Sequence, residues 1–409
     1  MIKTYKKVLK NGLTLLLVPD ETKNTTYCEL MIKFGGSIRS FMVDNKIYNI
    51  SYGLAHLLEH NIVENSIYGN SIDHFNKYHT SFNAATTYNI TSFYFETVYD
   101  FYDRLEEMVS IVNKPLFTNK INTIKKPIYE EIKRKNDIYN YNYVKALNEC
   151  IYNNNYINIL GDISDVKNIT NKELKFIHKI FYTPQNQILA ISGNFNINRT
   201  IQIIEKLYKR NKNINYKILN SKEKYEVNIK EKTVVEPKIN EQITISFKIP
   251  SKKFTKLEKI KLTYYLEFFL KYNFDDNSAN FKEVTLKKYS LTSFNKVIDK
   301  VLDNMVILSI NLMTKYFDEF KNIVFSSINK MYISPEYFEL EKRITLINHI
   351  KNSTNINYIF DQYLTNYLSF NYNKVDSINF INSLNYDECI ELLKRLDFSN
   401  YTIVKEVKK

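Results

Sequence analysis

Tryptophan is absent from this chain of 409 residues, and cysteine and glycine are scarce. The three cysteines, Cys28, Cys150 and Cys389, are odd in number and far apart, so they indicate neither a disulfide framework nor a cysteine-rich metal site. No stretch approaches the roughly 18 apolar residues of a membrane-spanning helix, and the N-terminal residues lack the apolar run of a secretory signal. We therefore expect buried free thiols, no membrane span and a cytoplasmic location.

The charge and the apolar content indicate what kind of protein this is. The net charge is +13, but the basic residues are scattered and form no basic block or basic–aromatic stripe. We therefore expect a solvated basic surface and no nucleic-acid partner. Apolar residues make up 44%, which is enough for well-filled cores, and the length favours two domains of about 200 residues each.

Short apolar and β-branched runs alternate with helical patterns, which is typical of an α+β fold. The expected strands are Leu13–Val18, Glu29–Phe34, Thr91–Val98 and Gln187–Ser192. The expected helices are Gly53–Asn65, Phe101–Val112, Ile121–Asp137 and Asn171–Phe181. The last of these helices begins after Thr170, with Glu173 placed as in a capping box.

The second half of the chain repeats the plan of the first half. Three pairs of strand-like segments match at nearly the same spacing. The corresponding residues are Phe34 and Phe247 (247 − 34 = 213), Phe93 and Ile307 (307 − 93 = 214), and Asn186 and Asn400 (400 − 186 = 214). The agreement of the three offsets predicts an internal duplication of one α+β domain.

The boundary between the two copies is expected in a polar segment. Residues 213–236 are rich in Lys, Asn and Glu and are interpreted as a linker. The expected domains are therefore residues 1–212 and 237–409. All seven glycines lie at or before Gly193, so the second copy has no glycine for special backbone turns. We expect the chemistry to lie in the first domain.

The segment His56-Leu57-Leu58-Glu59-His60 has the pattern His-x-x-Glu-His. Residues four apart share one face of a helix, so His56 and His60 can offer their imidazole nitrogens to one metal ion. Glu59 neighbours both histidines and can act as the general base toward a water molecule that the metal activates. This is the inverse order of the His-Glu-x-x-His motif of zinc peptidases, and it predicts one Zn²⁺ per chain.

A catalytic zinc site needs a third protein ligand. The best candidates are the adjacent carboxylates Glu130 and Glu131, on a helix that Pro127 is expected to break or start. Glu131 is favoured as the ligand, and Glu130 as an outer neighbour or a solvent-facing residue. Spacing alone also allows an exposed acidic pair. Glu64, one turn beyond His60, is a further candidate that we interpret as a hydrogen-bonding neighbour.

These motifs together resemble the pitrilysin/insulinase (M16) family of zinc peptidases, in particular its short members of mitochondrial-processing-peptidase type. The resemblance covers residues 10 to about 200, in the family's order. Its matching stretches are Asn11-Gly12-Leu13, Gly35-Gly36-Ser37, Gly53 to His60, Phe82-Asn83-Ala84-Ala85-Thr86, Glu131-Ile132, Gly161-Asp162-Ile163, Tyr182 to Asn186 and Ser192-Gly193-Asn194.

The resemblance implies a fold, a ligand and a substrate site. It implies two homologous α/β-roll domains, each a mixed, mainly antiparallel sheet flanked by helices, that together form half of a clamshell. It implies that Glu131 is the distal zinc ligand. It also implies that residues 82–86 form an edge strand to which a peptide substrate adds as a further strand, with Asn83 and Ala84 contacting the substrate backbone.

Three positions, one in the first copy and two in the second, depart from the family pattern. The family's further glutamate, one to two turns before the ligand, is replaced by Ile124, so outer support for the zinc must come from Glu130 or Glu64. In the second copy the family's arginine and tyrosine, which bind the substrate carbonyl, correspond to Leu286 and Ser293. Their absence leaves the site electrostatically incomplete.

Two functions are compatible with these observations. The first is a zinc-dependent metalloendopeptidase that cleaves short or unfolded peptides, such as precursors or leader peptides. The resemblance then implies a heterodimer with a related subunit that carries the arginine–tyrosine pair; a homodimer is the alternative. The second is a catalytically weak, peptide-binding or structural subunit. The missing pair favours the second function, whereas a general base beside two ligands favours the first.

Overall fold

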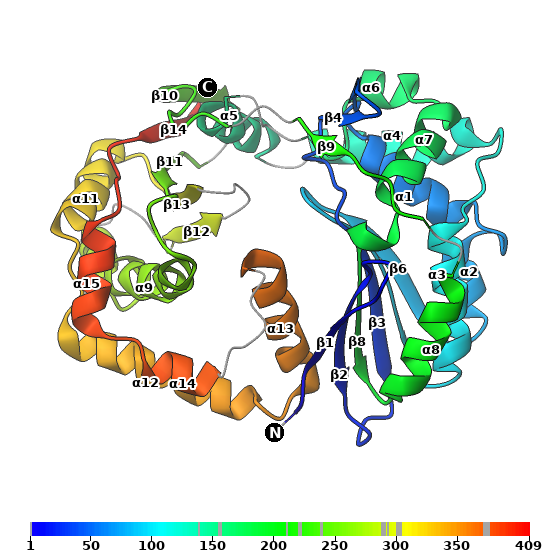
Figure 1. The fold of residues 1–409 in the computed structure, drawn as a ribbon. Helices are drawn as coiled ribbons and strands as arrows, with labels where there is room; N and C mark the ends of the chain where they lie inside the picture. The colour runs from blue at the N-terminus through cyan, green and yellow to red at the C-terminus, as the bar shows by residue number, and fades with distance from the viewer. Residues whose placement is uncertain are drawn as a thin grey trace. The chain divides into compact units, whose positions relative to one another are not determined.

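The structure is a computed structural model whose contacts divide the chain into two compact units, drawn in Figure 1. Unit 1 comprises Met1–Asp137, Ile157–Ser221 and Asn352–Asn373, and unit 2 comprises Ile138–Tyr156, Lys222–Lys351 and Lys374–Lys409. The residues that the structure describes are 2–137, 140–153, 158–209, 212–219, 223–237, 240–287, 292, 294–299, 305–370 and 377–409.

Unit 1 is built on a six-stranded sheet with the order β1-β2-β8-β3-β7-β6. Its strands are β1 (Tyr5–Val8), β2 (Thr14–Pro19), β3 (Thr26–Ile32), β6 (Ser81–Thr86), β7 (Thr91–Thr97) and β8 (Gln187–Gly193). Only β2 and β8 pair in parallel; the other neighbours are antiparallel. A small second sheet joins β5 (Lys46–Asn49), β4 (Ser40–Val43) and β9 (Lys217–Ile218).

Both faces of the central strands in unit 1 are covered. Leu15, Leu30 and Leu189 face the main core under several helices, whereas Leu16 and Met31 face a smaller cluster under α13. This two-sided burial explains why β2 and β8 read as continuous apolar runs. The helices of the main layer and its surroundings are α1 (Leu54–Glu64), α2 (Ser71–Asn76), α3 (Phe101–Asn113), α4 (Ile121–Asn136), α6 (Ile163–Asn168), α7 (Asn171–Phe181) and α8 (Ile197–Leu207), and α13 (Ile356–Phe370) lies on the opposite face (Figure 1).

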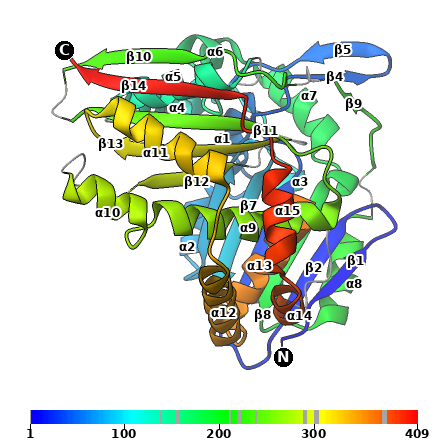
Figure 2. The same cartoon turned by 90° about the vertical axis from the view of Figure 1, so that its left-hand side faces the viewer.

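Unit 2 repeats this sheet with one strand fewer. Its order is β10-β14-β11-β13-β12, which Figure 2 shows from top to bottom. Only β10 and β14 pair in parallel, as β2 and β8 do in unit 1. The match of order and direction confirms the α+β class and the two homologous domains. The strands are β10 (Glu231–Glu236), β11 (Gln242–Pro250), β12 (Asn295–Asp299), β13 (Met305–Met313) and β14 (Tyr401–Lys408).

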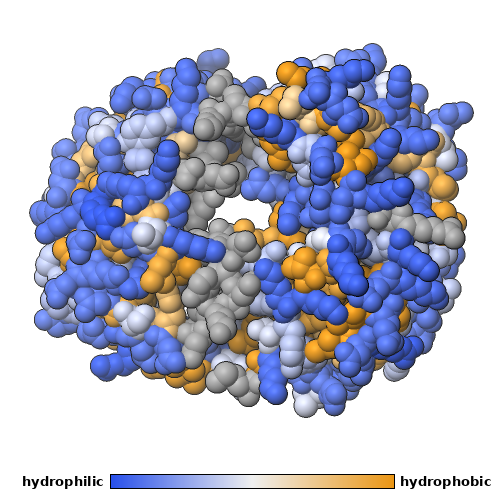
Figure 3. Space-filling model, viewed as in Figure 1, coloured by the Kyte–Doolittle hydropathy of each residue, from blue (hydrophilic) through white to orange (hydrophobic). Residues whose placement is uncertain are grey.

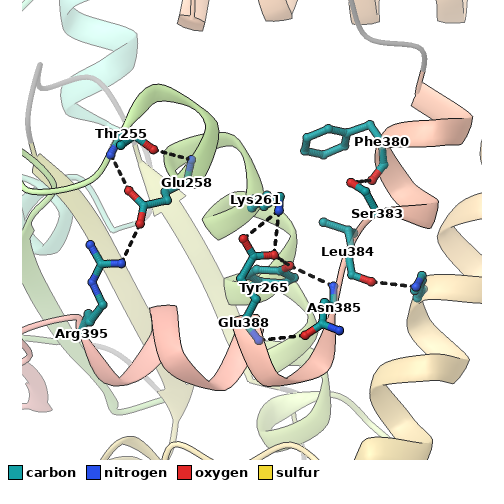
Figure 4. A network of polar contacts seen from close by, with 11 residues as sticks. Thr255, Glu258, Lys261, Tyr265, Phe380, Ser383, Leu384, Asn385, Glu388 and Arg395 are labelled. Atoms are coloured by element: carbon teal, nitrogen blue, oxygen red, sulfur yellow. Dashed lines mark hydrogen bonds and ion pairs between the residues drawn. The ribbon is translucent and has the colours of Figure 1, made fainter.

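The helices of unit 2 pack on the apolar face of its sheet, where Ile243, Ile245 and Phe247 of β11 are fully buried. A polar network links two of these helices (Figure 4). Lys261 of α9 pairs with Glu388 of α15 at 2.7 Å, and Arg395 pairs with Glu258 at 2.6 Å. The helices are α9 (Lys256–Phe274), α10 (Ala279–Leu286), α11 (Phe317–Lys330), α12 (Pro335–Asn352), α14 (Ser377–Asn382) and α15 (Tyr386–Lys394).

Each unit contains one helix from the other half of the sequence. Helix α5 (Tyr141–Ile151) belongs to unit 2, where Tyr143 donates or accepts a hydrogen bond with Thr244 at 2.7 Å. Helix α13 belongs to unit 1, where Phe360 packs on the sheet. The units therefore differ from the contiguous domains 1–212 and 237–409, because these two helices find their apolar partners on the other sheet.

Two local expectations need correction. The interpreted linker, residues 213–236, contains β9 and β10, and β10 pairs along its whole length with β14. Its exposed edge position explains its polar sequence. Pro127 neither breaks nor starts a helix, since α4 runs through it from Ile121 to Asn136. Pro127 and Thr123 lie on the exposed face, where water can bond the Thr123 carbonyl that proline leaves without an N–H donor.

A buried ion pair in unit 2 gives a stability prediction. The Lys248 ammonium is fully buried, lies 2.6 Å from the Glu223 carboxylate, and donates to the Ile151 carbonyl at 2.9 Å. Lys248→Met removes the cation and leaves the buried carboxylate, so we expect a loss of about 3 kcal/mol in the free energy of unfolding. Denaturant unfolding measures it. The double variant Lys248→Met/Glu223→Gln should recover part of the loss, and an unchanged midpoint in the single variant would contradict the prediction.

The face of the molecule in Figure 3 shows hydrophilic residues interspersed with small apolar areas. Among the described residues, no helix is both long enough and apolar enough to cross a membrane. The three cysteines, Cys28, Cys150 and Cys389, are buried and free.

Candidate active site

Two glycines fix the start of helix α1, which carries the His-x-x-Glu-His motif. Gly53 caps the helix with φ of 77°, and Gly161 packs against it with φ of 69°. A Cβ atom on Gly53 would lie 2.4 Å from the Leu160 carbonyl oxygen. Both positions therefore require glycine, for backbone conformation and for space. Their contact holds the first turn of α1 beside the segment that contains Leu160.

The structure brings His56, His60 and Glu131 together. The Nε2 atom of His56 lies 3.5 Å from one oxygen of Glu131, and the Nε2 atom of His60 lies 3.6 Å from the other. One candidate ligand atom from each residue lies within 4.8 Å of the others. The two histidines come from one face of α1 and the carboxylate comes from α4. The arrangement is the one expected of two ligands one turn apart and a third from a distant helix.

The spacing of these atoms fits a zinc ion. Zinc bonds to histidine nitrogen and carboxylate oxygen are about 2.0–2.2 Å, so tetrahedral ligand atoms lie roughly 3.3 Å apart. The nitrogen–oxygen distances of 3.5 and 3.6 Å are close to that value. Two imidazoles and one carboxylate are also a donor set that catalytic zinc uses, with a fourth position left for water or substrate.

The protonation of the histidines differs because their neighbours differ. Burial, helped by the nearby His60, lowers the pKa of His56 to about 3, which keeps this imidazole neutral and able to bind a metal. Burial also acts to lower the pKa of His60, but the hydrogen bond with Glu64 and the charges of Glu59 and Glu131 outweigh it and raise this pKa. The carboxylates around His60 thus attract a cation, either a proton or a metal ion.

Glu59 points a buried carboxylate into the same site. Its Oε2 atom accepts a hydrogen bond of 2.6 Å from the Thr86 hydroxyl of strand β6. Burial raises the pKa of Glu59 and the charge of Glu131 adds to it, whereas Thr86 and His60 act to lower it. A raised carboxylate pKa suits a group that must take up a proton and release it again near neutral pH.

Glu64 and Glu130, the two glutamates expected to lie next to the metal ligands, have different surroundings. Glu64 accepts a hydrogen bond of 3.0 Å from the Nδ1 atom of His60, so it orients that ring and leaves Nε2 for a metal. Glu130 is exposed and pairs with Lys133 at 2.8 Å, away from the histidines. Of the two roles expected for Glu130, the structure therefore matches the solvent-facing one. Among the described residues, Glu130 makes no hydrogen bond or ion pair with His56, His60 or Glu131.

Strand β6 forms one wall of the pocket above these residues. Among the described strands it pairs with β7 alone, so it is an edge strand whose other edge has no partner within that part of the chain. Asn83, Ala84, Ala85 and Thr86 line the pocket, which has a volume of about 640 Å³ and also includes the histidines and Glu131. The expected substrate residues Asn83 and Ala84 therefore lie beside the candidate metal site.

The structure shows the surroundings of the positions at which the sequence differs from the family pattern. Ile124 is buried in the main core, and the neighbouring Lys125 donates to the carbonyls of Lys167 and Ile169. Among the described residues, the buried Nδ1 atom of His56 has no hydrogen-bond partner. Within that part of the chain, no acidic side chain therefore orients the His56 ring through Nδ1. Leu286 is the last residue of α10, and Ser293 lies outside the described residues.

Sequence reasoning assigned no role to Thr86 or Lys135, two polar residues that line the pocket. Thr86 lies at the end of the segment expected to bind substrate, but its hydrogen bond to Glu59 depends on how β6 packs against α1. Lys135 also lines the pocket, one helical turn after Glu131. The spacing Glu131 to Lys135 was a usable signal, because residues four apart share a helix face.

Comparison with known proteins gives three findings. The model of a family described as "Peptidase M16 inactive domain" matches residues 168–345, a range that does not include the His-x-x-Glu-His motif. An uncharacterized zinc protease YmfH of Bacillus subtilis is 29% identical over 196 residues, which is 46% of this chain and 45% of that protein. Zinc protease PqqE of Helicobacter pylori is 24% identical over 220 residues, 52% of this chain and 48% of that protein.

The matches thus span about half the length of these two relatives. An M16-like protein of Alicyclobacillus acidocaldarius has the same fold, with a TM-score of 0.89, 18% identity, and coverage of 100% of this chain and 99% of that one. The duplicated fold is that of M16-like proteins, and the two relatives that match part of the chain are named zinc proteases. The comparisons agree with the resemblance to the peptidase M16 family that the sequence motifs predicted.

Proposed function

We propose that this chain is a zinc-dependent metalloendopeptidase that cleaves short or unfolded peptides. The observation that supports the proposal most strongly is the convergence of His56 Nε2, His60 Nε2 and the Glu131 carboxylate beside the buried Glu59. The two relatives named zinc proteases are consistent with it. A purely structural subunit has no need of a general base next to a set of metal ligands.

In this proposal each residue has one task. When bound, zinc lowers the pKa of water and polarises the carbonyl of the scissile peptide bond. His56, His60 and Glu131 hold the ion, and Glu64 fixes the His60 ring through Nδ1. Glu59 accepts the proton of the attacking water and returns it to the leaving amine nitrogen. Thr86 holds the Glu59 carboxylate in place through its hydrogen bond.

The substrate binds in extended form along β6. The open edge of this strand offers backbone N–H and C=O groups to a peptide, which would join the sheet as a further strand. Main-chain hydrogen bonds are independent of side chains, so they accept many sequences. Asn83 and Ala84 lie on the part of β6 that lines the pocket. A segment that is already paired within a folded protein cannot join β6, which favours short or unfolded peptides as substrates.

A partner subunit is part of the proposal. The positions of the family's arginine and tyrosine hold Leu286 and Ser293 in this sequence. A related chain that carries this pair would complete the charge stabilisation around the substrate carbonyl. The alternative function, a peptide-binding subunit with weak catalysis, is favoured by the missing pair and by the His56 Nδ1 atom that lacks an orienting partner among the described residues.

Metal removal tests the proposal. The purified protein, alone and co-expressed with a related subunit, is assayed for zinc content and for cleavage of fluorogenic oligopeptides. We expect about one zinc per chain, loss of cleavage after chelation, and recovery on adding zinc back. Cleavage that survives complete zinc removal would contradict the metallopeptidase proposal. Zinc binding and peptide binding without cleavage in every pairing would support the peptide-binding subunit instead.

A further inference from the structure

Lys135 lies in the candidate active site, although no part of the proposed mechanism uses it. It follows Glu131 by four residues on α4, so the two side chains leave the same face of the helix, one turn apart. Both line the pocket, together with Ile159 and Leu160, which directly follow the Lys135 partner Asn158 in the sequence. Among the described residues that line this pocket, Lys135 is the only lysine or arginine, whereas three residues carry carboxylates: Glu59, Glu64 and Glu131.

The charge of Lys135 is incompletely compensated. Its Nζ atom donates to the Asn158 amide oxygen at 3.2 Å, and within the described part of the chain no carboxylate lies within ion-pair distance of it. Burial lowers the pKa of Lys135, and the more distant Asp162 opposes this shift. A half-buried ammonium with a neutral amide as its partner retains donors for a second, charged acceptor.

The position of that amide is itself fixed. Asn158 donates from its side-chain nitrogen to Asp162 at 3.1 Å, so its oxygen is directed toward Lys135. Gly161 donates its backbone N–H to the Asn158 carbonyl at 3.1 Å and thereby closes a turn beside Gly53. The contact between Gly53 and Gly161 thus fixes the start of α1 and also positions Asn158. Asn158 in turn holds the Lys135 ammonium at the pocket wall.

We propose that Lys135 determines substrate specificity by binding a carboxylate that flanks the scissile bond of the peptide. This inference rests on the proposed peptidase function. One helical turn is about 5.4 Å and an extended peptide advances about 3.3 Å per residue. A carboxylate at Lys135 therefore lies within about two residues of the bond held over the histidines. The chemistry fits an Asp or Glu side chain near the bond, or the terminal carboxylate of a peptide.

Peptide pairs that differ in a single charge test the proposal. One pair has Glu or Gln within two residues of the cleaved bond, and a second pair, with Gln there, has a free or an amidated C-terminus. Binding is measured by fluorescence anisotropy in a zinc-loaded Glu59→Gln background, which separates binding from cleavage. The variants are Lys135→Met, Lys135→Arg and, as a matched control, Lys133→Met, whose lysine is exposed on the same helix.

We expect the parent to bind the acidic member of one pair roughly tenfold more tightly, the gain typical of a charge-assisted hydrogen bond. Lys135→Met should remove this preference, whereas Lys135→Arg and Lys133→Met should keep it. The pair that shows the preference identifies a side-chain or a terminal carboxylate. Equal binding of both members by the parent, or a uniform loss with all peptides in Lys135→Met, would overturn the inference.

The outcomes also separate this inference from the proposed function. A charge preference that depends on Lys135, in a wild-type protein that cleaves none of the peptides with or without a partner, would support the carboxylate contact of Lys135 and contradict the peptidase. Cleavage of acidic and neutral peptides at equal kcat/KM, unchanged in Lys135→Met, would leave the peptidase standing and remove the inference. If no peptide binds at any concentration tested, both are contradicted.

Discussion

The Glu59→Gln variant is expected to keep its zinc and to lose about 10²–10⁴-fold in kcat for peptide hydrolysis, the range that a positioned general base contributes. Glutamine has nearly the same shape and its amide oxygen can still accept the hydrogen bond from Thr86, but it cannot take a proton from water. Zinc content by mass spectrometry and steady-state kinetics with a fluorogenic peptide measure the two halves of this prediction.

A partly buried carboxylate elsewhere in the unit provides the control. Glu29 of β3 lies outside the pocket and accepts a hydrogen bond of 3.0 Å from the Tyr27 hydroxyl, so Glu29→Gln changes a comparable group without touching the chemistry. We expect this variant to keep kcat. Equal activity of Glu59→Gln and the wild-type protein would remove Glu59 from the mechanism, whereas a loss of zinc from Glu59→Gln would show that it acts as a ligand.

Three neighbouring glutamates are expected to have graded effects on zinc affinity. Glu131→Gln removes a charged ligand and should weaken zinc binding by more than the roughly 10–100-fold typical of an outer residue. Glu64→Gln should fall within that range, because it loses the charged contact to His60 Nδ1. Glu130→Gln should bind zinc as the wild-type protein does, since Glu130 is exposed and pairs with Lys133. Competition titration with a zinc-binding dye measures all three.

The adjacent pair makes this series decisive. Glu130 and Glu131 undergo the same substitution on the same helix, so effects on helix stability and net charge are matched. A loss of zinc in Glu130→Gln with full binding in Glu131→Gln would reverse the ligand assignment. Equal affinity in all three variants would show that the carboxylate of α4 does not contact the metal.

Local patterns were sufficient to predict the main elements of the first unit. The strands expected at Leu13–Val18, Thr91–Val98 and Gln187–Ser192 correspond to β2, β7 and β8 within one or two residues. The helix expected at Asn171–Phe181 has those bounds, and its capping box with Thr170 and Glu173 is present. Apolar periodicity and a capping signal are local, so a single sequence carries them in full.

The exchange of α5 and α13 between the units could not be predicted in this way. Tyr143 of α5 and Phe360 of α13 are ordinary apolar-face residues, and nothing in their local sequence states which sheet they cover. Strand β10 was missed because an exposed edge strand needs few apolar residues. Both features depend on contacts between segments far apart in the chain.

In the candidate site, too, some residues could be predicted from local sequence and others depend on contacts between distant segments. His56, Glu59 and His60 follow from a spacing of four residues, whereas spacing only favoured Glu131 over Glu130, and resemblance to a family then implied Glu131 as the ligand. The structure separates the two glutamates by distance: Glu131 lies 3.5 and 3.6 Å from the histidines, and Glu130 pairs with Lys133. The roles of Thr86 and Lys135 depend on the packing of β6, α1 and α4. The four-residue spacing places Lys135 on the helix face of Glu131, but it does not show that this face lines a pocket. The cytoplasmic location stays a prediction.

The most direct test of the proposed metal site is a crystal structure of the zinc-loaded protein with anomalous diffraction collected at the zinc edge. We expect one strong peak per chain, about 2.0–2.2 Å from His56 Nε2, His60 Nε2 and a Glu131 oxygen. Glu59 should lie near the ion without bonding to it. A peak at other residues, or no peak in a protein that contains stoichiometric zinc, would contradict the assignment of these three residues as the ligands.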